Sequence, residues 1–190
     1  LPVMGYVVGG ALSTPLVART QSRFGRRKSF QIGLLVALTS ACVAAWAVAD
    51  KNFWLLVAAT VVAGYYSANG QLYRFAAAEL VPAPQREKAV SMVLAGGLIG
   101  AIAGPNLAAR SRSLLDVPFA GAYVVLAVVA IVAMVLMAFI RFPQNAVATT
   151  GSSSGRPLRE IMRQPVFMVA CASAALGYGV MNLLMAATPL

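Results

Sequence analysis

The residues with the most specific chemistry lie near the C-terminal end, in the run GYGVMNLLMAATPL. Tyr178, Met181, Asn182 and Met185 are spaced i, i+3, i+4 and i+7, so a helix would present them on one face. Thioether sulfur is soft, uncharged and does not titrate, so it suits Cu(I) and binds Mg, Ca or Zn poorly. The spacing would therefore allow a weak cuprous site at Met181 and Met185, flanked by Tyr178 and Asn182. Methionine also commonly fills gaps between helices, and packing is the interpretation that the spacing alone favours.

A second polar group interrupts an apolar stretch in the middle of the chain. Tyr65, Asn69 and Tyr73 recur every four residues, and Arg74 lies beside them. Because polar side chains are costly against lipid, this face is predicted to look onto a central cavity or a neighbouring helix, as part of a substrate pathway. Arg74 is either a functional cation within the membrane or a side chain that reaches the interface, with Glu79 as its partner.

The segment ARTQSRFGRRK holds a cluster of cations around a glycine. Gly25 permits a tight turn between two helices, and the guanidinium groups of Arg23, Arg26 and Arg27 can pair with carboxylates or with helix C-termini. Glu79 is the nearest candidate partner for Arg23 or Arg26. Such pairs would tie neighbouring helices together, and simple anchoring of the loop to anionic lipid is the alternative.

Glycines form a seam in another apolar stretch. Gly96, Gly100 and Gly104 recur every four residues and precede Pro105. Such a seam allows close contact with a second helix, and the proline predicts a kink at its end.

The composition indicates the kind of protein in which these groups lie. Of the 190 residues, 60% are hydrophobic and only 11% are charged, too little polar surface for a soluble globule, so the chain is predicted to be a membrane protein. It has no His, which excludes histidine-based catalysis and imidazole metal sites within these residues. Cys42 and Cys171 both fall in apolar stretches and imply no disulfide framework. We expect no enzyme activity.

Apolar stretches of about twenty residues are long enough to cross a bilayer as helices. The sequence divides into six of them, at Leu1 to Val17, Ser29 to Ala49, Phe53 to Ala78, Ala89 to Ala109, Phe119 to Ile140 and Val166 to Leu190. Because the chain begins in one apolar stretch and stops in another, we expect it to be a fragment.

The loops between these spans predict their orientation. Alternate loops carry 11 basic residues against 3, and the richer loops are expected in the cytoplasm. The net charge of +10 is therefore mostly a signal of topology in a lipid bilayer, and no nucleic-acid partner is predicted. The last of these loops also holds a Ser/Gly-rich linker, PQNAVATTGSSSGRP, followed by a short amphipathic helix with Leu158, Ile161 and Met162 on one face and Arg159 and Arg163 on another. Such a linker would join two lobes that move against each other; an ordinary long loop is the alternative.

The basic segment resembles the loop signature of the major facilitator superfamily, Gly-x-x-x-Asp-Arg-x-Gly-Arg-Arg/Lys, which follows the second transmembrane helix there. Arg23, Gly25, Arg26 and Arg27 match the signature, whereas Ala18 replaces its Gly and Ser22 its Asp. The glycine seam resembles the Gly-Pro motif of the family's fifth helix. The resemblance implies an all-α membrane protein whose six transmembrane helices correspond to helices two to seven of a twelve-helix major facilitator fold. It also implies that the basic segment forms a gate at the cytoplasmic side, with Glu79 as the nearest candidate partner in place of the missing Asp.

That correspondence also implies a domain organisation. Residues 1–141 would form the N-terminal lobe helices, residues 142–165 the cytoplasmic linker, and residues 166–190 the first helix of the C-terminal lobe.

Within that superfamily the sequence resembles the bacterial copper importers, in the runs QLYRFAAAELVP, REKAVSMVLAGGLIGAIAGPNLA, RPLREIMRQPVF and GYGVMNLLMAATPL. The resemblance implies a multi-pass protein of the bacterial cytoplasmic (inner) membrane that imports copper by alternating access and supports assembly of a heme–copper oxidase. Copper would be the substrate, with no bound cofactor, and copper chaperones or oxidase assembly factors would be partners. Those proteins pair the Met-x-x-x-Met motif at Met181 and Met185 with a His-x-x-x-Met on helix eight, which these residues lack.

Two other functions stay open at this point. A proton-coupled exporter of small organic molecules would fit the Gly-Pro motif and the tyrosine-rich third span, although Glu79 and Glu87 both lie at the cytoplasmic edge. A transport-inactive scaffold for oxidase assembly would need neither methionine.

Overall fold

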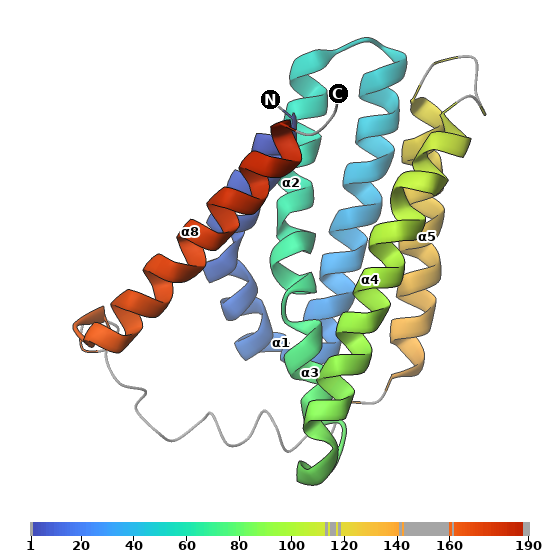
Figure 1. Ribbon diagram of the computed structural model, residues 1–190. Coiled ribbons are helices and arrows are strands. Elements are labelled where there is room, and N and C mark those ends of the chain that lie inside the picture. The colour runs from blue at the N-terminus through green and yellow to red at the C-terminus, as the bar shows by residue number, and fades with distance from the viewer. Residues whose placement is uncertain are drawn as a thin grey trace. The chain divides into compact units, whose positions relative to one another are not determined.

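The computed structural model describes residues 2–112, 114, 117, 119–140, 142, 160 and 162–187, which are nearly all helical and contain no strand (Figure 1). The prediction of an all-α membrane protein is confirmed. The chain divides into two compact units, residues 1–148 and residues 149–190. The elements are α1 (Pro2–Ala49), α2 (Phe53–Gly70), α3 (Tyr73–Glu79), the short 3-10 helix η1 (Ala83–Gln85), α4 (Arg86–Ser111), α5 (Ala120–Phe139) and α8 (Pro165–Ala187).

Helix α1 is two helices joined at a sharp break. Gly25 lies in the break with φ 79° and ψ 168°, a backbone conformation open to glycine and essentially closed to other residues. The first two predicted spans, Leu1 to Val17 and Ser29 to Ala49, therefore occupy the two halves of α1, which double back on each other in Figure 1. The glycine predicted to make a tight turn does so.

The core of the first unit forms where α2 packs against both halves of α1. Gly9 and Gly64 allow the first half of α1 to cross α2 at backbone contact, since a Cβ on either would overlap the other helix. The second half of α1 runs back beside α2 and α5, and Phe30 is its most completely buried large side chain. Asn52 begins α2 by accepting a hydrogen bond from the backbone N–H of Leu55 at 3.1 Å.

The third predicted span, Phe53 to Ala78, is not one continuous helix. Helix α2 ends at Gly70, and the N–H of Leu72 bonds to the carbonyl of Asn69, three residues back, before α3 begins at Tyr73. Glycine has a low helix propensity, so Gly70 is a favourable place for the hydrogen-bond pattern to shift. Within the described part, four helical segments are long and apolar enough to cross a membrane, and α2 is not among them.

Helices α4 and α5 expose many large apolar side chains, among them Ile99 and Phe139. Such faces are typical of helices that contact lipid or further membrane helices. Helix α4 continues for six residues past Pro105, and the Asn106 amide donates to the carbonyl of Ile102 at 2.8 Å.

The sequence-based linker lies mostly outside the described residues. Residues 143–159 and 161, which include Leu158, Arg159 and Ile161 of the expected amphipathic helix, are not described. The linker and its helix therefore stay predictions, as do the domain boundaries at residues 141 and 165.

Candidate functional site

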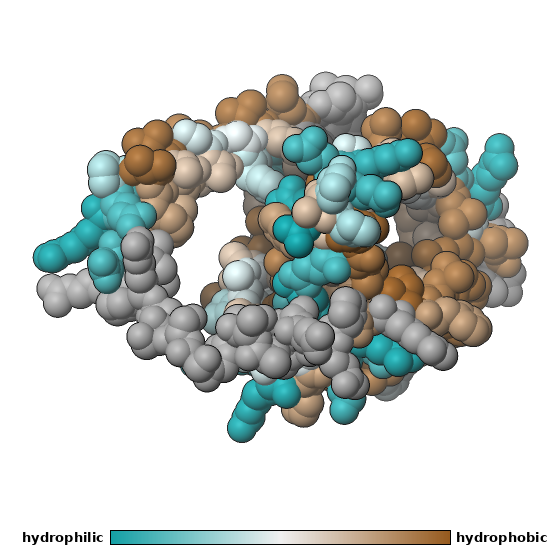
Figure 2. Space-filling view, turned by 90° about the horizontal axis from the view of Figure 1, so that it is seen from below, coloured by the Kyte–Doolittle hydropathy of each residue, from teal (hydrophilic) through white to brown (hydrophobic). Residues whose placement is uncertain are grey.

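The cations around Gly25 lie where α1 turns at one end of the first unit. The Arg26 guanidinium pairs with the Glu79 carboxylate at the last residue of α3, 53 positions along the chain. The side chains of Arg26 and Glu79 are 27% and 35% exposed, so the pair is only partly screened by solvent. Figure 2 views the molecule from below, and hydrophilic side chains gather near the middle of the view with hydrophobic ones beside them.

Arg27 uses a different partner. Its guanidinium donates to the carbonyl oxygen of Ala138, in the last turn of α5, at 2.6 Å. Carbonyls in the last turn of a helix have no partner within the helix and carry partial negative charge. A guanidinium there supplies both a hydrogen-bond donor and a compensating positive charge. The two adjacent arginines therefore tie the turn of α1 to α3 and to α5 at once.

Arg23 is exposed on the first half of α1, and it is Arg26 that contacts Glu79. Ser22 occupies the position where the superfamily signature has an acid, and its hydroxyl donates to the Arg19 carbonyl of its own helix at 2.9 Å. Ser22 thus does not replace the missing carboxylate. The role of the cluster as a gate stays a prediction.

Asn69 is completely buried between α2 and the second half of α1. Ser29 donates to its side-chain oxygen at 3.3 Å, and Gly33 provides the room, since a Cβ there would lie 2.9 Å from the Asn69 amide nitrogen. The amide nitrogen itself has no hydrogen-bond partner in the described structure. Asn69 therefore faces a neighbouring helix, one of the two environments predicted for this face.

The tyrosines of this face also contact α1. The Tyr65 hydroxyl donates to Thr20 at 3.1 Å, and the Tyr73 ring packs edge-on against Phe30 with centroids 4.8 Å apart. The Tyr73 hydroxyl and the Gln21 amide nitrogen are buried without a hydrogen-bond partner among the described residues. Sequence reasoning missed Gln21, although it lies in the quoted basic segment.

Arg74, predicted on the same face, is exposed on α3. Its guanidinium lies over the Phe75 ring, 4.9 Å from the centroid, and Glu79 pairs with Arg26 instead. The structure therefore gives Arg74 a partner other than the one suggested by sequence. Its assignment to a substrate pathway is untested.

Within the described part of the first unit, no helix packs closely against the glycine seam. A Cβ on Gly96, Gly100 or Gly104 would meet nothing within 4 Å. The role of the seam in helix packing therefore stays a prediction.

The candidate copper residues lie in α8, in the second unit. Tyr178 and Met181 are both exposed on this unit, and the Asn182 amide donates to the Tyr178 carbonyl at 2.9 Å, one turn earlier. The side chain of Met185 lies outside the described residues, so the distance between the two sulfurs is not defined. Among described residues, no three His, Cys, Asp or Glu side chains gather at one place.

Comparison with solved structures supports the helical arrangement. The chain superposes on the xylose transporter XylE from E. coli, in a partially occluded inward-open conformation, with a TM-score of 0.63 at 20% sequence identity. The alignment covers 79% of this chain and 39% of that one. At this identity the match shows the fold alone.

Comparison with curated sequences extends over the whole chain. The riboflavin transporter RfnT of Brucella anthropi is 34% identical over 196 residues, covering 100% of this chain and 48% of the relative. The uncharacterized MFS-type transporter YddS of Bacillus subtilis is 30% identical over 107 residues, 56% of this chain and 24% of its own length. This chain thus spans about half the length of RfnT. The family model described as Major Facilitator Superfamily matches residues 1–190, and the chain belongs to that superfamily of multi-pass membrane transporters.

Proposed function

We propose that the full-length protein transports a small organic solute across a bacterial cytoplasmic membrane, and that riboflavin or a related planar heteroaromatic is its substrate. The observation that carries this proposal is the 34% identity to a riboflavin transporter along the entire chain. The copper importers suggested by sequence resemblance have no counterpart among these relatives. Of the two open transport functions, organic solute transport is therefore better supported.

The polar groups of the first unit are compatible with a neutral organic substrate. Apart from its basic residues, the first unit has hydroxyl and amide groups at Thr20, Gln21, Tyr65, Asn69 and Tyr73, and such groups donate and accept hydrogen bonds without carrying charge. The acidic residues that the structure describes in the first unit lie at helix ends or in turns, at Asp50, Glu79 and Glu87. A carboxylate for proton coupling would have to lie elsewhere in the full-length protein.

Copper import is the second candidate function, and one observation supports it. Met181 and Met185 both lie in α8 at a spacing of one turn, which would place two soft sulfurs on one face. The same spacing occurs in helices that use methionine only for packing, so the proposal ranks below organic solute transport.

The two proposals are separated by growth and uptake in one strain. We would express the full-length protein in bacteria that neither synthesise nor import riboflavin, and measure uptake of labelled riboflavin and accumulation of copper. The organic-solute proposal expects riboflavin-dependent growth, unchanged copper content, and the same flavin uptake in a Met181→Leu/Met185→Leu variant, since leucine keeps the packing volume. Copper accumulation that this variant abolishes, without flavin uptake, would favour the second candidate.

A further inference from the structure

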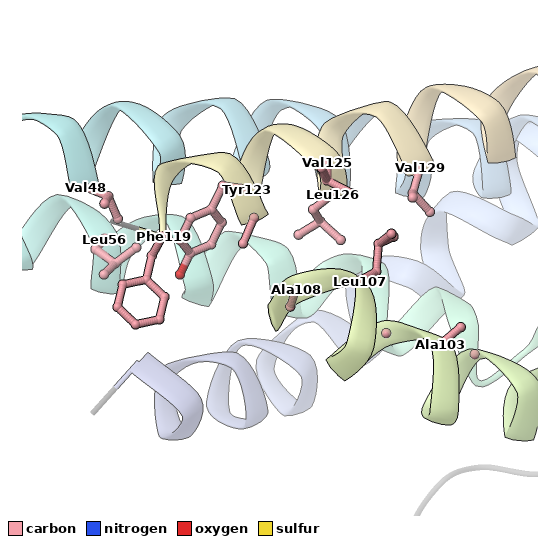
Figure 3. Close-up of a pocket in the computed structure, with 13 residues that line it drawn as sticks. Val48, Leu56, Ala103, Leu107, Ala108, Phe119, Tyr123, Val125, Leu126 and Val129 are labelled. Carbon is pink, nitrogen blue, oxygen red and sulfur yellow. The ribbon is translucent and has the colours of Figure 1, made fainter. Parts of the chain in front are cut away.

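The large cavity of the first unit offers few groups that could recognise a polar solute. It measures about 690 Å³ and lies between α4, α5 and the adjoining ends of α1 and α2. The residues that line it include no charged side chain, and in Figure 3 the Tyr123 hydroxyl is the oxygen drawn among their side chains. Hydrogen-bonding groups that fix the orientation of a bound solute must therefore be sought on other surfaces of the unit.

Side chains of this kind lie on one face of α3 and the turn before it. Gln71, Arg74 and Phe75 are spaced i, i+3 and i+4, so they share a face, and all three are exposed. Tyr73 packs against α1 and Ala76 is buried, so the side of α3 that contacts the rest of the unit is a different one. The exposed face thus combines an amide, a guanidinium and an aromatic ring.

Arg74 is the charged member of this face, and it does not pair with the acid of its own helix. That acid, Glu79, pairs with Arg26. The Arg74 guanidinium lies over the Phe75 ring, 4.9 Å from the centroid. Stacking occupies a planar side of the guanidinium and leaves the N–H groups at its edge able to donate to an acceptor. Because a guanidinium against acyl chains is costly, we expect this face to meet water and solute.

We propose that Arg74 is a specificity-determining residue that donates hydrogen bonds to a carbonyl edge of the transported solute. The inference rests on the proposed transport of riboflavin or a related heteroaromatic, and it adds which edge of that solute is recognised. The flavin ring is flat and carries a carbonyl oxygen at C2 beside the unprotonated N1, two acceptors on one edge. The planar fork of a guanidinium donates to two such acceptors in parallel, and Phe75 offers a ring on which a flat solute stacks.

An anionic lipid headgroup is the other acceptor that Arg74 could meet. A phosphate is attracted by positive charge alone, so it gives no reason for an aromatic ring and an amide on the same face. A flat heteroaromatic solute uses all three groups, since its ring stacks and its heteroatoms form hydrogen bonds. The composition of the face therefore favours the solute.

Exchange assays in liposomes with the full-length protein test this inference. The two substrates are labelled riboflavin and its 2-thio analogue, in which sulfur, a weaker hydrogen-bond acceptor, replaces the oxygen at C2. The variant is Arg74→Gln, and the matched control is Arg86→Gln, which removes one exposed cation from the first residue of α4. KM and kcat are measured for both substrates, and the preference between substrates does not depend on how much protein has folded.

The wild type should prefer riboflavin to the 2-thio analogue. Arg74→Gln should raise the KM for riboflavin by about 10- to 100-fold, as expected when a hydrogen bond from a charged group is lost, and should abolish the preference. Arg86→Gln should change neither. A wild type without this preference, or an unchanged preference in Arg74→Gln, would overturn the inference, even if uptake of both substrates fell equally, because an equal fall indicates a role in lipid contact or folding. Exchange by the wild type would then still support the transport proposal, whereas a wild type that exchanges no flavin overturns both.

Discussion

Gly25 is predicted to be hard to replace because of its backbone conformation. At φ 79° and ψ 168° an L-amino acid with a Cβ is strained, and such strain costs about 1–3 kcal/mol. Gly25→Ala should therefore lower the melting temperature of the purified full-length protein by several degrees, at about 2–4 °C per kcal/mol. Gly25→Asn should be equally harmful, because asparagine tolerates the left-handed helical region, with ψ near 47°, and not this extended ψ.

The matched control for this prediction is Gly70→Ala, at the last residue of α2. Gly70 has no positive φ, and a Cβ there would meet nothing within 4 Å. Alanine should therefore be neutral, or stabilising by about 0.5–1 kcal/mol, since it favours the helix. Melting is measured in detergent by fluorescence-detected size exclusion. The account of the turn would be wrong if Gly25→Ala had the melting temperature of the wild type. It would also be wrong if Gly25→Asn were as stable as the wild type.

Three further predictions concern the contacts around this turn and Asn69. In a double-mutant cycle of Arg26→Gln and Glu79→Gln, the coupling free energy from thermal melts should be about 1 kcal/mol, because this half-exposed pair lies between exposed and buried ion pairs. A coupling near zero would show that the ion pair does not stabilise the turn. Arg27→Gln should cost about 1 kcal/mol of stability, because the Ala138 carbonyl loses a charge-assisted hydrogen bond, and no loss on melting would show that water replaces the guanidinium. Gly33→Ala should destabilise the protein by about 1–3 kcal/mol, because the added methyl group crowds the Asn69 amide. Adding Asn69→Ser should recover part of that loss. If the single and the double variant had the same melting temperature, this contact would be contradicted.

Local patterns in the sequence were sufficient for the helices and for the turn at Gly25. The apolar stretches of about twenty residues became helices because in lipid every backbone polar group must be satisfied within the segment. The charge of the basic segment and the position of Glu79 also indicated a pair, although only the packed structure distinguishes Arg26 from Arg23 as the partner.

Features that depend on packing were not predictable in the same way. The break between α2 and α3 is a local shift of the backbone hydrogen bonds after Gly70, within an apolar stretch whose length predicted one continuous helix. The fit of Gly33 to Asn69 needs the register between two helices 36 residues apart in sequence, which periodicity does not contain. The spacing of Met181 and Met185 could not identify a substrate, because methionines four residues apart suit both helix packing and copper binding.

The central claim, transport of a small organic solute, is tested most directly with purified full-length protein in liposomes. The measurement is uptake of labelled riboflavin against a preloaded excess of the unlabelled compound, with empty liposomes as the background. The account predicts saturable, protein-dependent exchange that unlabelled riboflavin competes for and that Cu(I) does not inhibit. Absence of flavin exchange, together with copper uptake that requires Met181 and Met185, would contradict it.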